Sequence, residues 1–242
     1  MQILGRSEKG PIRAENEDAF RVADLGAHSC FAIVCDGMGG EAGGNIASEI
    51  ATTRISEVIS AGYRSDMENR HISDMLKAAI SSANILVYNK AQKNPELQGM
   101  GTTAVVCIVR EDTAYIMNVG DSRAYLIKDR EVEQITRDHT MVQSYVDQGK
   151  ITEEEARVHP KKHLITRALG VEDKVVPDYY EVPLGVGESI LICTDGLTNY
   201  FDNEDLLIES TALPRAKLMD DLIQGAIERG GNDNITVVLI TR

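Results

Sequence analysis

The segment TTAVVCIVREDTAYIMNVGDSRAYLIKDREVEQI, residues 102–135, limits the possible fold more than any other part of the chain. It consists of successive apolar runs rich in β-branched residues, which are typical of strands. The breaks between them are short and polar, at Glu111-Asp112, Gly120-Asp121 and residues 128–130. Short turns of this kind join antiparallel strands. We therefore expect an antiparallel meander here.

Two long helical patterns precede this segment. Apolar residues recur at three-and-four spacing over 41–62 and 71–94, and no strand-like run separates the two patterns. A regular alternation of strands and helices would need such a strand, so a wholly parallel sheet is disfavoured. The fold class that we predict is α+β with antiparallel sheets.

The second half of the chain contains an insertion. Residues 137–170 are polar and carry three of the five histidines. We interpret them as a flap with short helices near 140–149 and 152–158. A strand pair near 176–193, helices near 203–210 and 214–229, and a last strand at 235–241 complete the prediction. No linker or low-complexity segment divides the chain, so residues 1–242 are expected to form a single catalytic domain.

The composition excludes several classes of partner. The net charge of −13 disfavours an extended nucleic-acid or anionic membrane surface. No apolar run approaches the roughly 18 residues of a membrane span, and the start lacks a signal-peptide core. We therefore expect a cytoplasmic protein without a membrane span. The cysteines lie in or beside apolar runs without a CxxC pair, which predicts reduced core residues: Cys30, Cys35, Cys107 and Cys193.

Two apolar strands end in the same dipeptide. FAIVCDG (31–37) and SILICTDG (189–196) place Asp36 and Asp195 where a sheet meets solvent. Asp-Gly alone commonly marks a turn. Further acidic residues, however, adjoin other strands or their ends: Glu17, Asp18, Asp121 and Asp233. If these ends meet, the carboxylates repel one another unless cations lie among them. Oxygen ligands without His or Cys favour Mg²⁺ or Mn²⁺.

The segment GMGGEA, residues 37–42, also fits the dinucleotide-binding pattern G-x-G-x-x-A, with Glu57 twenty residues beyond Gly37. The context contradicts that interpretation. The helix that follows leads to a second helix rather than to a parallel strand, and Asp36 would face a pyrophosphate of like charge.

An ordered set of motifs resembles a known family. Its members here are GPIRAENED (10–18), VCDGMGG (34–40), GMGTTAVV (99–106), NVGDSRAY (118–125), TRDH (136–139), CTDGLTN (193–199) and GGNDNITVV (230–238). Together they resemble the metal-dependent serine/threonine protein phosphatases of the PPM (type 2C) family, in their compact bacterial form. The resemblance implies a four-layer αββα sandwich: two antiparallel sheets flanked by helix pairs, with a metal site at one end.

The resemblance also implies roles for individual residues. It implies two Mn²⁺ or Mg²⁺ ions bridged by Asp36, and a third ion at Asp121 as in bacterial members. A hydroxide between the two ions would attack phosphoserine or phosphothreonine directly, without a phosphoenzyme. The remaining roles are metal binding by the Gly37 carbonyl, Asp195 and Asp233, phosphate binding by Arg13, and support of the metal-bound waters by Glu17, Asp18 and Asn234.

Two departures from the family pattern concern the proton donor and the outer part of the site. Many eukaryotic members have a histidine where this chain has Met38. Either a metal-bound water or His139, from the flap side, would then protonate the leaving oxygen. We expect His139 to be structural. Asn199 occupies a position where aspartate is frequent, which concerns the outer hydrogen bonds rather than the metal ligands.

The function that we predict is a protein phosphatase, acting as a monomer on phosphoproteins that include a cognate serine/threonine kinase. Two alternatives stay open. A phosphatase of the sporulation or stress-regulator branch shares DGMGG but usually lacks the start Arg-x-x-Asn-Glu-Asp, which this chain has at 13–18. An inactive binding module on the same fold is disfavoured by the complete set of aspartates.

Overall fold

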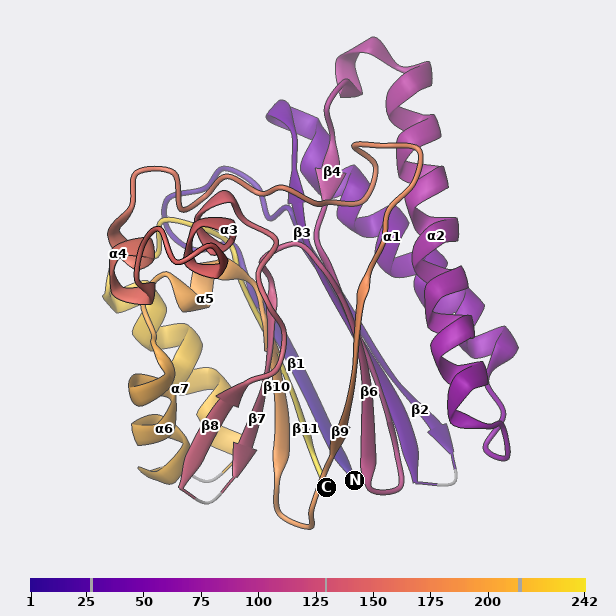
Figure 1. Cartoon of the computed structure of the whole chain (residues 1–242), viewed down its shortest axis with the longest axis vertical. Coiled ribbons are helices and arrows are strands. Elements are labelled where there is room, and N and C mark those ends of the chain that lie inside the picture. Colours follow the sequence, from indigo (N-terminus) through magenta and orange to yellow (C-terminus); the bar gives the residue numbers. More distant parts are fainter. Residues whose placement is uncertain (27, 129, 213–214) are drawn as a thin grey trace.

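The computed structural model describes residues 1–26, 28–128, 130–212 and 215–242, and in them the strands form two antiparallel sheets packed face to face. Helices cover the outer faces (Figure 1). The strands are β1 (Gln2–Glu8), β2 (Asp18–Gly26), β3 (Ser29–Met38), β4 (Gly101–Thr102), β5 (Ala104–Arg110), β6 (Thr113–Val119), β7 (Arg123–Lys128), β8 (Glu131–Gln134), β9 (Asp178–Pro183), β10 (Ser189–Cys193) and β11 (Ile235–Thr241). The helices are α1 (Gly40–Gly62), α2 (Asn69–Lys93), η1 (Pro95–Leu97), α3 (Met141–Asp147), α4 (Glu153–Val158), α5 (Asp195–Thr198), α6 (Asn203–Ala212) and α7 (Arg215–Glu228).

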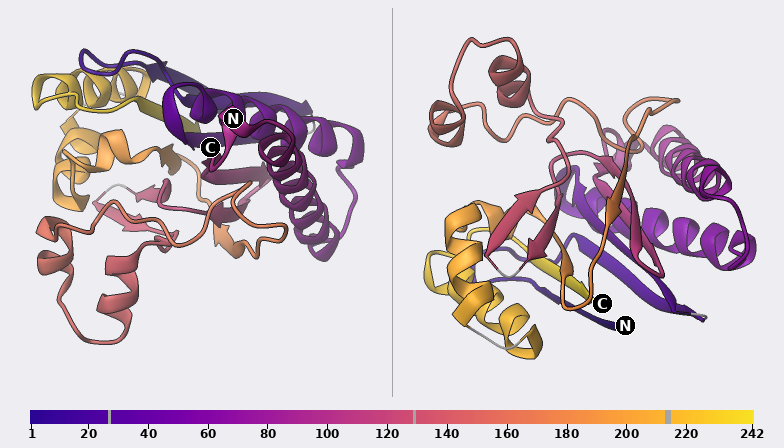
Figure 2. Two further views of the ribbon diagram at one scale, coloured as in Figure 1. Left: turned by 90° about the horizontal axis from the view of Figure 1, so that it is seen from above. Right: turned by 60° about the horizontal axis from the view of Figure 1, so that its bottom comes forward.

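One sheet has the strand order β1-β11-β10-β7-β8, and the other has the order β2-β3-β5-β6-β9, with β4 paired to β3 beside this path. Helices α1 and α2 pack on the second sheet, whereas α6 and α7 pack on the first (Figure 2). The predicted four-layer αββα class is therefore confirmed.

Strand β3 shows how the layers are built. Cys30, Ala32 and Val34 point into the apolar core between the sheets, where β7, β10 and β11 of the opposite sheet contribute the facing residues. Phe31 and Ile33 point the other way, into the core beneath α1 and α2. A strand covered on both faces needs apolar residues at every position, which explains why FAIVC reads as a continuous apolar run.

The predicted meander is wrong at one point. Strands β5 and β6 pair with each other, and so do β7 and β8, but β6 and β7 belong to different sheets. The chain leaves one sheet at Gly120, which has a φ of 106°, and β9 takes the place beside β6. The strands predicted as a pair near 176–193, β9 and β10, likewise lie in different sheets. Both connections have the sequence of a short turn. A hairpin and a crossover between sheets differ only in which faces of the two strands are buried, and a short turn does not show this. The turn predicted at 128–130 includes Asp129, which lies outside the described residues.

Two strands were not predicted at all. β1 pairs with β11, and β2 pairs with β3. A period-two signal was present in β2, because Phe20 and Val22 face the core between the sheets while Ala23 and Leu25 face the helices. Charged residues interspersed in the strand, Arg21 and Asp24, obscured it.

The flap forms with the helices that the sequence predicted. Thr140 caps α3 by accepting from the Gln143 N–H, and Thr152 and Glu155 form a capping box at α4. The flap lies at the end of the sandwich opposite the two termini (Figure 1). All four cysteines are buried and free, as predicted. Among the described residues, no helix combines the length and apolarity that crossing a bilayer requires.

Candidate metal centre

Asp36 lies at the end of β3, and its backbone is held by the next strand. Its N–H donates to Thr103 Oγ1 at 2.9 Å, and its carbonyl accepts from the Thr103 N–H and the Thr102 hydroxyl, each at 2.9 Å. In the register of β2 and β3, Asp18 stands directly opposite Asp36. Two carboxylates in that relation repel each other, so the sheet itself brings like charges together.

Gly37 and Gly196 follow the two strand-end aspartates for the same physical reason. A Cβ on Gly37 would lie 2.1 Å from the Gly44 carbonyl oxygen and 2.5 Å from that of Glu17. A Cβ on Gly196 would lie 1.9 Å from the Asn234 carbonyl oxygen. The protein's own backbone fills the space beside Gly37, and each glycine allows a segment carrying further acidic residues to approach its strand end.

Asn234 joins the N-terminal loop to the end of β11. Its side chain accepts from the Glu17 N–H at 2.8 Å and donates to the carbonyls of Lys9 and Glu15, each at 2.9 Å. The same loop carries Arg13, whose Nη2 lies 2.8 Å from Asp233 Oδ2. The Arg13 side chain is 46% exposed, so its guanidinium lies at the mouth of the site rather than inside it.

Asp18 connects the two sheets beneath the site. Its Oδ2 accepts from the hydroxyls of Thr194 and Thr236 at 2.9 and 2.7 Å, and both threonines belong to the opposite sheet or its end. Its Oδ1 is buried without a hydrogen-bond partner. Burial raises the pKa of Asp18 to about 7. A buried carboxylate oxygen without a donor is costly in free energy, and a cation or a cation's water would compensate it.

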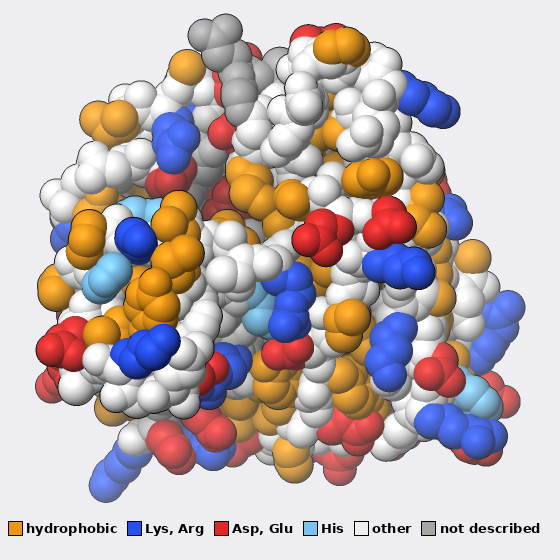
Figure 3. All heavy atoms as spheres, turned by 45° about the horizontal axis from the view of Figure 1, so that its top comes forward, with side chains coloured by type: hydrophobic (Ala, Val, Ile, Leu, Met, Phe, Trp, Pro, Cys, Tyr) orange, Lys and Arg blue, Asp and Glu red, His pale blue; other side chains and the backbone are white. Residues whose placement is uncertain are grey.

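The aspartates lie within electrostatic reach of one another. Burial raises the pKa of Asp36 well above its usual range, and the charges of Asp18, Asp195, Asp121 and Asp233 raise it further. Burial and then Asp195 raise the pKa of Asp121 to about 8. Burial and then Asp233 also raise the pKa of Asp195. On this end of the molecule, acidic side chains lie recessed in a hollow (Figure 3).

Asp121 reaches the pocket from the crossover between the sheets rather than from a strand end. The crossover is anchored on Thr103, because the Ser122 and Thr103 hydroxyl oxygens are 2.7 Å apart. A Cβ on Gly120 would lie 2.5 Å from the Thr103 methyl carbon. Thr103 therefore contacts the backbone of Asp36 and the crossover that carries Asp121 at the same time.

His139 lies at the base of the flap and is buried. Its Nδ1 accepts from the Gly120 N–H at 3.0 Å, so the proton of the neutral ring belongs on Nε2, which lies 3.2 Å from Asp178 Oδ2. Arg167 Nη1 lies 2.9 Å from the same nitrogen. Burial lowers the pKa of His139. With its ring nitrogens engaged by the fold, His139 has the surroundings of a structural residue.

These residues fit hard divalent ions. The donors are carboxylates and a carbonyl, and the unpartnered Asp18 Oδ1 gives the site an unsatisfied acceptor. Within the described ranges, no three His, Cys, Asp or Glu side chains converge closely enough to enclose an ion by themselves. Mg²⁺ and ions like it keep several waters and need few protein carboxylates, so an open arrangement suits them.

A groove leads away from the pocket. It begins at Asp121 and Asp195 and runs between the flap, β8 and the start of α6, with a volume of about 860 Å³. Lys162 and His163 of the flap line it, and Lys162 Nζ lies 3.3 Å from Asn199 Oδ1. The groove is large enough for several residues of a polypeptide.

The sequence analysis assigned no role to the residues that hold these carboxylates in place. Thr102, Thr103, Thr194 and Thr236 all lie within the motifs that carry the resemblance, but only Thr194 adjoins an acidic residue in the sequence. A threonine beside an aspartate at a strand end is the signal that could have identified Thr194, because its hydroxyl can satisfy a neighbouring backbone group or carboxylate. The other three meet their partners only in the fold.

Comparison with known proteins agrees with this fold. The family model described as protein phosphatase 2C matches residues 13–235. The serine/threonine phosphatase stp of Listeria welshimeri is 37% identical over 240 residues, which cover 98% of this chain and 94% of that protein. The serine/threonine protein phosphatase PstP of Mycobacterium tuberculosis is 35% identical over 240 residues, 99% of this chain and 44% of PstP. The chain therefore belongs to the protein phosphatase 2C family.

Solved structures show the same architecture. The serine/threonine phosphatase Stp1 of Staphylococcus aureus superposes with a TM-score of 0.94 at 34% identity, covering 100% of this chain and 94% of Stp1. The catalytic domain of PstP, solved in complex with two manganese ions, superposes with a TM-score of 0.84 at 34% identity, covering 98% and 96% of the two chains.

Proposed function

We propose that this chain is a metal-dependent protein phosphatase that hydrolyses phosphoserine and phosphothreonine in proteins. One observation carries the proposal: Asp36 is half-buried at the end of β3, opposite Asp18 in the strand register and within electrostatic reach of Asp121, Asp195 and Asp233. Such a concentration of negative charge is stable only with cations or protons among the carboxylates. Membership of the family supplies the reaction that this site serves.

The residues that would hold Mn²⁺ or Mg²⁺ are Asp36, the Gly37 carbonyl, Asp195 and Asp233, with Asp121 contributing to a third site beside Asp195. Two such ions, when bound, acidify water to a nucleophile and neutralise the charge that develops on a phosphoryl group. Glu17, Asp18 and Asn234 support this set from outside. Asp18 connects the sheets through Thr194 and Thr236, and Asn234 holds the loop that carries Glu17.

Arg13 is placed to bind the substrate's phosphate. Its guanidinium is about half exposed at the mouth of the pocket and already contacts Asp233. A planar guanidinium can donate to two phosphate oxygens at once, so it orients the phosphate as well as attracting it.

His139 is not needed to donate a proton in this scheme. Its Nδ1 accepts from a backbone N–H and its Nε2 faces Asp178 and Arg167, so protonating the ring at Nδ1 would break the contact with Gly120. We assign it a structural role. The proton for the serine or threonine oxygen then comes from water in the site.

We further propose that the enzyme is a cytoplasmic monomer, that residues 1–242 act as a single catalytic domain, and that its phosphoprotein substrates include a serine/threonine kinase. The groove between the flap and α6 supports a polypeptide substrate. The Arg-x-x-Asn-Glu-Asp start at 13–18 argues against the stress-regulator alternative, and the complete set of aspartates argues against an inactive module.

The direct test is phosphate release from matched phosphothreonine, phosphoserine and phosphotyrosine peptides, measured with Mn²⁺ and after treatment with EDTA. We expect hydrolysis of the first two peptides, little of the third, and loss of activity on chelation. Manganese binding without hydrolysis of any peptide would support the inactive module instead. Autophosphorylated kinase from the same organism serves as the protein substrate.

A further inference from the structure

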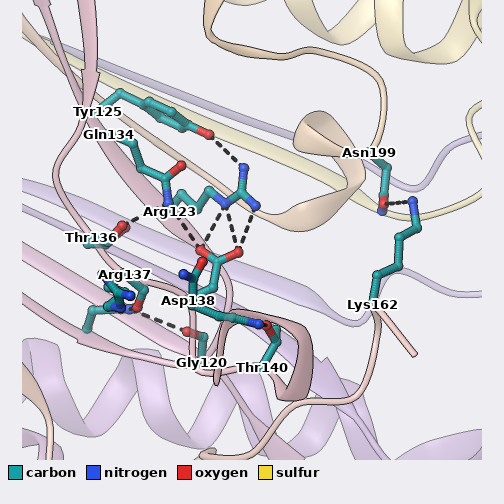
Figure 4. A network of polar contacts seen from close by, with 12 residues as sticks. Gly120, Arg123, Tyr125, Gln134, Thr136, Arg137, Asp138, Thr140, Lys162 and Asn199 are labelled. Atoms are coloured by element: carbon teal, nitrogen blue, oxygen red, sulfur yellow. Dashed lines mark hydrogen bonds and ion pairs between the residues drawn. The ribbon is translucent and has the colours of Figure 1, made fainter. Parts of the chain in front are cut away.

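A partly buried ion pair joins Arg123, two residues beyond Asp121 in the chain, to Asp138. Arg123 Nε is 2.9 and 3.1 Å from the two carboxylate oxygens of Asp138, and Arg123 Nη2 is 2.7 Å from Oδ2 (Figure 4). This is the side-on arrangement in which a guanidinium fixes a carboxylate in orientation as well as in distance. The Arg123 side chain is 28% exposed and that of Asp138 is 10% exposed.

Neighbouring groups complete the coordination of this pair. Arg123 Nη1 donates to the Tyr125 hydroxyl at 3.1 Å, and Gln134 Nε2 donates to Asp138 Oδ1 at 3.2 Å and to the Thr136 carbonyl at 2.8 Å. Tyr125 is fully buried. The pair is thus a satisfied polar network built into the fold, in contrast to the exposed ion pairs elsewhere on the surface.

The two partners come from the segments that meet at the metal centre. Arg123 opens β7 two residues after Asp121, and Asp138 belongs to the base of the flap. The same segments are joined on the other side of Asp121. The Gly120 N–H donates to His139 Nδ1 at 3.0 Å, and the His139 N–H donates to the Gly120 carbonyl at 2.9 Å.

The crossover is therefore clamped to the flap base both before and after Asp121. A further bond, from the Ala124 N–H to Thr136 Oγ1 at 2.9 Å, extends the contact along β7. The contacts at Gly120 do not involve Arg123 or Asp138, so the ion pair can be altered without removing them.

The charge of the pair matters as well as its shape. Burial and Asp195 raise the pKa of Asp121. The negative charge of Asp138 raises it further, and the positive charge of Arg123 lowers it. Arg123 alone would thus be a cation beside a site for cations. Paired with Asp138 it is neutral overall and can hold the crossover without repelling a divalent ion.

We propose that the Arg123–Asp138 ion pair positions Asp121 and thereby sets the affinity of the divalent-ion site to which Asp121 contributes. Arg123 and Asp138 are positioning residues in this assignment, since they act through Asp121. The inference rests on the proposed function, because it assumes that Asp121 binds an ion.

The test compares four variants of the full chain by isothermal titration of the metal-stripped protein with Mn²⁺. Arg123→Lys keeps the charge but loses the planar fork, and Asp138→Asn keeps the shape but leaves Arg123 uncompensated. Asp121→Asn identifies the binding event that depends on Asp121. Arg157→Gln is the matched control, because Arg157 also ties the flap to the body, through an exposed ion pair with Asp202 at 3.1 Å.

We expect Asp121→Asn to weaken or remove one Mn²⁺ binding event. Arg123→Lys and Asp138→Asn should weaken the same event by about 10- to 100-fold, the usual effect of changing a residue that supports a metal ligand. Turnover of a phosphothreonine peptide at limiting Mn²⁺ should fall with little change in the Michaelis constant, and excess Mn²⁺ should restore it. Arg157→Gln should leave the Mn²⁺ affinity unchanged.

Unchanged Mn²⁺ affinity in a folded Arg123→Lys or Asp138→Asn variant, with Asp121→Asn clearly affected, would overturn the positioning role and leave the proposed function intact. Unchanged binding in Asp121→Asn itself would overturn the role of Asp121 and this inference with it, while the assignments of Asp36, Asp195 and Asp233 would stand. A loss that excess Mn²⁺ does not restore would also count against the inference. Melting temperatures of all variants separate these outcomes from unfolding.

Discussion

Asp36 and Asp121 share one pocket, but the protein places them there by different means. Asp36 ends a strand that is covered on both faces, and its own backbone groups are hydrogen-bonded to Thr102 and Thr103. Asp121 lies in a crossover between sheets and depends on side chains: Ser122 with Thr103, Gly120 with His139, and Arg123 with Asp138. The ladders that pair β3 with β2 and β5 tolerate changes in the side chains around them, whereas the side-chain contacts at Asp121 do not. The two carboxylates should therefore respond differently to substitutions nearby.

The largest effect is expected from Asp36→Asn. The ions supply several kcal/mol of transition-state stabilisation, so loss of the bridging carboxylate should lower turnover of a phosphothreonine peptide on the order of a thousandfold or more. The fold should persist and the melting temperature of the metal-free protein should rise, because one of several repelling charges is gone. Asp195→Asn and Asp233→Asn should behave alike. Near-normal turnover of Asp36→Asn at saturating Mn²⁺ would contradict the two-metal assignment.

Thr103→Val should remove the residue that serves both carboxylates. It leaves the Asp36 N–H and the Ser122 hydroxyl without their partner, and unsatisfied buried groups of this kind should lower the free energy of unfolding by about 3 kcal/mol in total. Urea denaturation of the metal-free protein measures this. Thr103→Ser, which retains the hydroxyl, is the control. Equal loss in both variants would mean that the methyl group, packed against Gly120, matters more than the hydroxyl.

Arg13→Ala should chiefly raise the Michaelis constant. A charge-assisted hydrogen bond contributes about 1.5–3 kcal/mol, which corresponds to roughly a 10- to 100-fold increase, while turnover should fall less. Arg13 would then differ from Asp36, because Arg13 binds phosphate already in the ground state, whereas Asp36 holds the ions that stabilise the transition state. Steady-state kinetics with the phosphothreonine peptide distinguish them. A loss confined to turnover would show that our role for Arg13 is wrong.

The raised pKa values predict how the metal-free protein responds to pH. Asp18 and Asp121 have folded-state pKa values of about 7 and about 8, against 3.8 for an ordinary aspartate. Between about pH 4 and pH 8 the folded protein keeps protons that the unfolded chain has released, so stability falls as the pH rises through this window.

Melting temperatures in EDTA should accordingly drop by at least a few degrees from pH 5 to pH 8. The same series at saturating Mn²⁺ should be flatter, since bound cations favour the ionised carboxylates. An increase in melting temperature over this range in EDTA would contradict the shared pocket.

The smallest effect is expected in His139→Ala, on the ratio of the turnover rates of two substrates. As a structural residue of the crossover clamp, His139 should affect a phosphothreonine peptide and p-nitrophenyl phosphate to the same extent. A general acid would instead help mainly the peptide, whose alkoxide leaves poorly, and its loss would cost on the order of a hundredfold there alone. A strong defect confined to the peptide, with Mn²⁺ affinity unchanged, would assign the acid to His139.

The features that could be predicted from the sequence are those with a local signal. Asp36 and Asp195 were identified because each ends an apolar run and precedes glycine, and such signals are local. The long helices were predicted from apolar periodicity, which is also a local signal, and short helices were predicted within the polar flap. Strands β1 and β2 were not, because they are amphipathic and interrupted by charges, and their pairing partners lie elsewhere in the chain.

The sequence by itself determined which carboxylates this protein carries at its strand ends, and with them the kind of ion that it can bind. Only the tertiary structure decided that β6 and β7 lie in different sheets. It also decided that Asp18 accepts from Thr194 and Thr236 of the opposite sheet or its end, and that Arg123 pairs with Asp138. It also showed why Gly37 and Gly196 are glycines, since the carbonyls that exclude a side chain there come from other segments. Hydrophobic periodicity reports which face of an element is buried, but not which distant segment will cover it.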